Sequence, residues 1–84
     1  MNKLHELNFY EIWTDGKVYN VYDPYALAGK FKSEIAALEW VAKVPDGKGD
    51  NIGPVKHARH IAKCLLKERL IEAKEMADYL EKVL

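Results

Sequence analysis

The chain has 84 residues, of which 49% are hydrophobic and 31% are charged, and its 13 basic and 13 acidic side chains balance to a formal net charge of zero. A chain of this length and composition supports one globular domain, which we place at residues 1–84, and excludes a disordered protein. The zero net charge argues against a protein that binds polyanions over its whole surface, although it allows a local basic patch.

The chain has one cysteine, Cys64, so it cannot form an internal disulfide and is not a secreted disulfide scaffold. Residues 1–7 contain neither a long apolar segment nor a small-residue cleavage site, and we therefore expect no signal peptide. No apolar run approaches the length of about 20 residues that a transmembrane helix needs. These features predict a cytoplasmic protein without a membrane partner.

Residues 7–22 are predicted to form a β-hairpin around Asp15-Gly16, because a two-residue turn favours this dipeptide. This turn would place Trp13 opposite Val18 and Ile12 opposite Tyr19. Side chains alternate between the two faces of a strand. One face would then carry Tyr10, Ile12, Tyr19 and Val21, and the other Phe9, Trp13, Val18 and Tyr22. Helices cover one face, and the second face is either core or an exposed contact surface.

A helix is predicted from Ser33, a favourable N-cap residue, to Val44, which precedes Pro45. We expect residues 26–32, before this helix, to be irregular, and residues 2–6 give no clear signal for a third strand. Residues 45–54 contain three glycines and two prolines, which predicts a loop. Pro54 then suits the first turn of the next helix.

The pattern from Val55 to Leu84 is helical throughout, but its apolar frame changes near residues 68–72. The second frame has apolar residues at steps of four and three. We call these residues the seam: Leu66, Leu70, Ala73, Ala77, Leu80 and Leu84. The predicted fold is α+β, with an N-terminal β-hairpin, one helix, a Gly-rich loop, and a C-terminal long bent helix or helical hairpin. The seam could also organise a homodimer.

A one-sided cluster of cations follows Pro54. We call it the basic ridge, and it comprises Lys56, Arg59, His60, Lys63 and Lys67. Residues 55–69 carry five Lys or Arg side chains against one acid, whereas residues 70–84 carry two against four acids. Such a ridge fits phosphates or an acidic protein surface. It is also compatible with the ordinary solvated face of an amphipathic helix.

His57, His60 and Cys64 share one side of this helix, and His60 and Cys64 are four residues apart. Structural zinc sites use four ligands drawn from two chain segments, and the sequence has no second cysteine. Cys64 inside a helix also makes a poor nucleophile site, because its backbone amides are committed to the helix. We predict no metal ligand, no catalytic residue and no cofactor.

These observations predict a non-enzymatic interaction module that binds and modulates a larger protein or nucleoprotein complex, as phage and mobile-element inhibitors of host defence or transcription do. Its partner-binding residues would be the basic ridge together with Phe9, Trp13 and Tyr22, since aromatic side chains often dominate binding energy. The alternative is a small nucleic-acid-binding protein that uses the same ridge, with the hairpin aromatics as a stacking platform.

Overall fold

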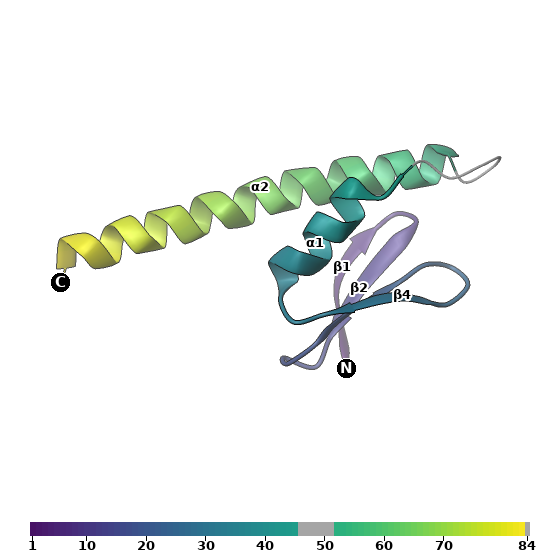
Figure 1. Ribbon diagram of the computed structural model, residues 1–84, viewed down its shortest axis with the longest axis horizontal. Helices are drawn as coiled ribbons and strands as arrows, with labels where there is room; N and C mark the ends of the chain where they lie inside the picture. The colour runs from purple at the N-terminus through teal and green to yellow at the C-terminus, as the bar shows by residue number, and fades with distance from the viewer. Residues whose placement is uncertain (46–51, 84) are drawn as a thin grey trace.

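The computed structural model describes residues 1–45 and 52–83 and has an α+β fold in two layers (Figure 1). The first layer is an antiparallel sheet with strand order β1-β2-β3-β4, and the second is a pair of helices on one face of it. The elements are β1 (Asn2–Leu7), β2 (Tyr10–Thr14), β3 (Tyr19–Tyr22), β4 (Leu27–Phe31), α1 (Glu34–Lys43) and α2 (Ile52–Val83).

The sheet has two strands more than the predicted hairpin, one at each edge. The expectation that residues 26–32 are irregular is wrong, because β4 pairs with β3 from Leu27 to Phe31. At the other edge, a two-residue connection joins β1 to β2, and its first residue, Asn8, has a φ of 63°. Asparagine tolerates this left-handed conformation better than most residues, which makes the tight turn possible.

The turn between β2 and β3 is longer than predicted. Asp15 Oδ1 accepts hydrogen bonds from the backbone amides of Lys17 and Val18, at 2.8 and 3.0 Å, and Thr14 pairs with Tyr19 across the ends of the strands. Ile12 therefore lies opposite Val21, and the predicted pairs Trp13–Val18 and Ile12–Tyr19 are wrong. The pairing of β2 with β3 is thus shifted by two residues from the predicted register. Because side chains alternate between faces with a period of two, the strand side chains remain on their predicted faces.

Helix α1 forms as predicted. Ser33 is the N-cap, with its hydroxyl accepting a hydrogen bond from the Ala36 amide at 3.1 Å, and the helix ends shortly before Pro45. Its inner side buries Leu38, Val41 and Ala42 against the sheet and α2. The expected stripe thus faces the core, which is what an amphipathic surface helix requires.

Helix α2 is one continuous helix of 32 residues, without the break that would have made a helical hairpin. It starts at Ile52, so Pro54 lies in the first turn, where the missing N–H is not needed. The rest of the predicted loop, residues 46–51, lies outside the described residues. At 1.5 Å per residue, the helix is about 48 Å long, and it accounts for most of the 53 Å long axis of the protein.

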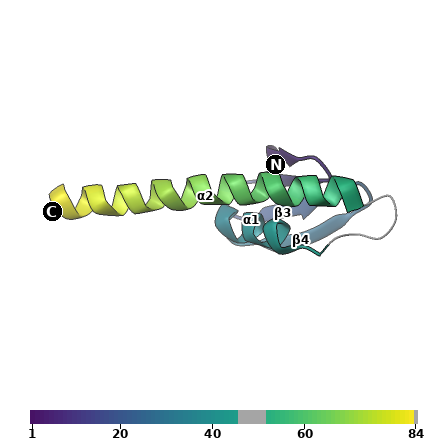
Figure 2. The same cartoon turned by 90° about the horizontal axis from the view of Figure 1, so that it is seen from above.

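The core occupies only the first half of α2. Leu7, Ile12, Val21, Leu38 and Val41 are fully buried. Helix α2 buries Val55, Ala58 and Ala62, and its partly buried side chains Ile61, Leu65 and Leu66 pack against the same core. Every described residue from Leu70 onward is exposed, and this part of α2 extends well beyond the rest of the protein (Figure 2). We call residues 70–83 the distal arm and the remainder of the described structure the body.

Neither described helix combines the length and the hydropathy that crossing a lipid bilayer would require.

Candidate interaction surfaces

The basic ridge lies on the side of α2 that faces away from the core. Lys56, His60, Lys63 and Lys67 are exposed. Arg59 differs from them, because it is half-buried and its Nη1 donates a hydrogen bond of 2.8 Å to the carbonyl oxygen of Val44. It thereby ties the end of α1 to α2. Four of the five ridge residues are therefore presented to solvent, while the Arg59 side chain is also used inside the body.

A shallow groove runs along α2 where the ridge meets the distal arm. Its apolar surface belongs to Leu66, Leu70 and Ile71, and lysine side chains line its edges. These lysines are Lys63, Lys67 and Lys74. A partner segment would be complementary to this groove if it placed apolar side chains on the strip and acidic side chains beside the lysines.

The predicted aromatic residues do not gather with the ridge. Trp13 and Tyr22 lie on the sheet face opposite the helices, because their neighbours Ile12 and Val21 point into the core. Trp13 is already engaged there, with its Nε1 donating to Glu11 Oε1 at 3.0 Å. Phe9 lies in the turn between β1 and β2, and its ring meets Tyr10 edge-on at a centroid distance of 5.0 Å. The sheet therefore separates Trp13 and Tyr22 from the basic ridge.

The distal arm carries large apolar side chains that are exposed. Leu70 is 49% exposed, Met76 60%, Tyr79 61% and Leu80 48%. Their acidic neighbours on the arm are Glu72, Glu75, Asp78 and Glu81. An apolar stripe of this kind on an exposed helix is typical of an element that packs against another surface.

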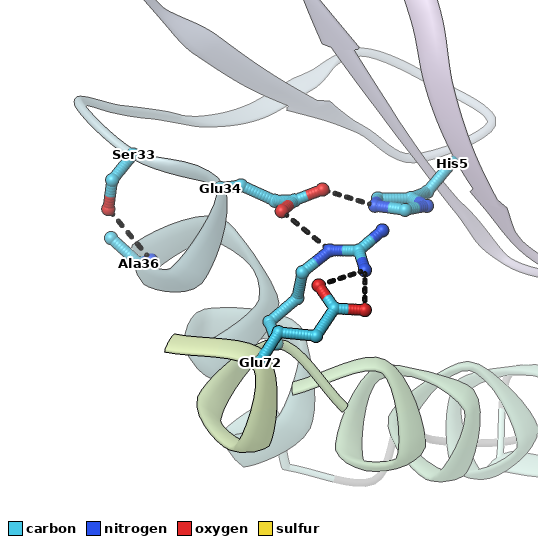
Figure 3. Close-up of polar contacts among 6 residues, drawn as sticks. His5, Ser33, Glu34, Ala36 and Glu72 are labelled. Atoms are coloured by element: carbon cyan, nitrogen blue, oxygen red, sulfur yellow. Dashed lines mark hydrogen bonds and ion pairs between the residues drawn. The ribbon is translucent and has the colours of Figure 1, made fainter. Parts of the chain in front are cut away.

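Four ionisable side chains meet where α2 leaves the body (Figure 3). Glu34 at the start of α1 binds His5 of β1 through Oε2, at 2.7 Å, and Arg69 of α2 through Oε1, at 2.9 Å. Arg69 also contacts Glu72 at 3.2 Å. The charge of Glu34 is the main reason that the pKa of Arg69 is raised. This charged cluster joins β1, α1 and α2 at the point where the distal arm begins.

Substituting Glu34 by glutamine is expected to loosen this junction. The change removes the only charge that both His5 and Arg69 contact in the described structure, and we expect a loss of about 1 kcal/mol in unfolding free energy. Urea denaturation measures this loss. The matched control is Glu39→Gln, since Glu39 forms no ion pair within residues 1–45 and 52–83. An equal effect of the two substitutions would show that the cluster is unimportant.

The His60 and Cys64 side chains approach each other on the exposed side of α2, with Nε2 and Sγ 3.8 Å apart. Within the described ranges, no group of three or more His, Cys, Asp or Glu side chains is close enough to hold one metal ion. At this position an exposed histidine lies beside an exposed thiol.

Comparison with known protein families, with curated proteins and with solved structures gives no match to this chain. The functional interpretation therefore depends on the surfaces described above. They are the basic ridge with its apolar groove, the distal arm, and the outer face of the sheet with Trp13 and Tyr22.

Proposed function

We propose that this protein is a non-enzymatic, cytoplasmic interaction module that binds and modulates a larger protein or nucleoprotein complex through the exposed face of α2. One observation carries the proposal: nearly half of a 32-residue helix extends beyond the body with its large apolar side chains in water. A helical segment that contributes nothing to the core of its own chain is costly to order unless a partner covers it.

The chemistry of the surface indicates what kind of partner it fits. An amphipathic helix is commonly recognised through apolar side chains at helical spacing. Here Leu66, Leu70 and Ile71 supply the apolar contacts, and the adjoining lysines attract acidic side chains. The expected partner surface is therefore apolar at its centre and acidic at its rim. A small domain that caps such a surface on a larger complex would act as a regulator or an inhibitor, as phage and mobile-element proteins that act on host defence or transcription do.

Charge reversal on the ridge tests the proposal. The double variant Lys63→Glu, Lys67→Glu should bind the partner at least tenfold more weakly, mainly because association becomes slower. Surface plasmon resonance against the captured partner measures both rate constants. The control is Lys17→Glu with Lys32→Glu, which changes the net charge equally at exposed positions away from α2. Unchanged affinity in the ridge variant would remove the ridge from the binding surface.

The alternative function is nucleic-acid binding, favoured by the line of exposed cations at Lys56, Lys63 and Lys67. It predicts an affinity that falls steeply between 50 and 200 mM salt, since phosphate contacts release counterions. Fluorescence anisotropy with labelled duplex and single strands measures this dependence. The position of Trp13 and Tyr22 on the other side of the sheet counts against a combined stacking and phosphate surface.

A further inference from the structure

We propose that the distal arm pairs with the distal arm of a second copy of this chain in an antiparallel arrangement, with Leu70 of each copy opposite Leu80 of the other. The inference rests on the proposed function only in treating the arm as an interaction surface. It adds the identity of the occupant and the register in which the occupant lies.

The spacing of the apolar residues is the first argument. Leu70, Ala73, Ala77 and Leu80 lie on one side of α2 with steps of three, four and three. This pattern is symmetric about residue 75, so a two-fold axis at that position places Leu70 opposite Leu80 and Ala73 opposite Ala77. Two-fold symmetry is the commonest form of self-association. The central alanines allow the helix axes to approach to about 8 Å, the short end of the range for packed helices.

The distribution of charge is the second argument. Lys67 and Glu81 lie on the same flank of the seam, on either side of the proposed axis. In the antiparallel arrangement Lys67 of each copy comes beside Glu81 of the other, which gives two ion pairs. In a parallel pair the opposite flanks of the two helices meet, so neither contact between Lys67 and Glu81 forms. The two ion pairs therefore favour the antiparallel orientation.

The position of the body is the third argument. The body covers α2 as far as Arg69, and only the distal arm, about 21 Å long, is exposed at every described residue. Antiparallel pairing places the two bodies at opposite ends of the paired arms, where they do not compete for space. It also leaves Lys56 and His60 of each copy exposed. The dimer would then present the part of each ridge nearer the body to a partner, while Lys67 takes part in the dimer contact.

Sedimentation velocity combined with electron spin resonance on the labelled native thiol tests the inference. The expected mass is twice the 9.6 kDa of the chain. Cys64 is exposed, lies on the side of α2 opposite the seam and is eleven residues from the axis. Antiparallel pairing therefore separates the two labels by about 33 Å along the helix axes. A monomer at about 200 µM, or labels level with each other as in a parallel pair, would overturn the proposal.

Substitutions test the register independently. Leu80→Glu should abolish the dimer, whereas Glu75→Gln, on the opposite side of the helix, should leave it intact. Lys67→Glu and Glu81→Lys should each weaken dimerisation roughly threefold to tenfold. The double variant should restore it, because the same two ion pairs form with the charges exchanged. Lack of restoration would contradict the register, and circular dichroism confirms that each variant is folded.

The outcomes separate this inference from the proposed function. A monomer that still binds a protein partner through the ridge would disprove the dimer and leave the function standing. A dimer with the expected label distance that binds no partner would support the inference and count against the function.

Discussion

Replacing Leu38 by alanine is expected to lower the free energy of unfolding by about 2–5 kcal/mol. Leu38 is fully buried on α1, between the sheet and α2, and its loss leaves a cavity that neighbouring side chains cannot fill without moving. Folded domains are stable by only about 5–15 kcal/mol, so the effect is a large fraction of the total. Urea denaturation followed by circular dichroism measures it.

The matched control is Ile71→Ala on the distal arm. Ile71 is 48% exposed, and we expect its replacement to change the unfolding free energy by no more than about 0.5 kcal/mol. Similar losses at the two positions would contradict the division of the molecule into a packed body and an arm that lies outside the core.

Ending the chain at Glu72 is expected to abolish self-association and to weaken partner binding strongly, while the body remains folded. The deletion keeps the contacts that Arg69 makes with Glu34 and Glu72, and removes only residues that are exposed where the structure describes them. The unfolding midpoint should therefore stay nearly unchanged, whereas the sedimentation coefficient should become that of a monomer.

A different result from the truncation would be informative. If the shortened chain lost its near-ultraviolet circular dichroism or unfolded at a much lower urea concentration, the arm would be part of the folding unit. If it stayed folded and still dimerised, the interface would lie on the body, and the edge strands β1 and β4 would become the candidates.

The elements with strong local signals could be predicted from the sequence. Ser33 and Pro45 bound α1, and Pro54 places the start of α2 within two residues. The edge strands were not predictable in the same way. Residues 27–31 contain alanine, glycine and lysine, which are uncommon in strands, so β4 exists because β3 offers it a pairing edge. For β1 the local signal is Asn8, because asparagine tolerates the left-handed conformation that the turn between β1 and β2 uses.

The candidate surfaces were only partly predictable. Helical spacing was enough to place Lys56, His60, Lys63 and Lys67 on one exposed side of α2. It did not distinguish a buried seam from an exposed one, because Leu70 and Leu80 follow the same pattern in either case. The contacts of Glu34 with His5 and Arg69 join residues 29 and 35 positions apart, so they depend on the packing of three elements.

Affinity capture from a lysate of the source cells determines whether a protein partner binds the exposed face of α2. The tagged chain, the Lys63→Glu, Lys67→Glu variant and the chain ending at Glu72 are compared after nuclease treatment, with quantitative mass spectrometry as the readout. We expect a stoichiometric protein partner that survives nuclease and is lost with both altered chains. A partner retained equally by all three, or captured only through nucleic acid, would contradict it.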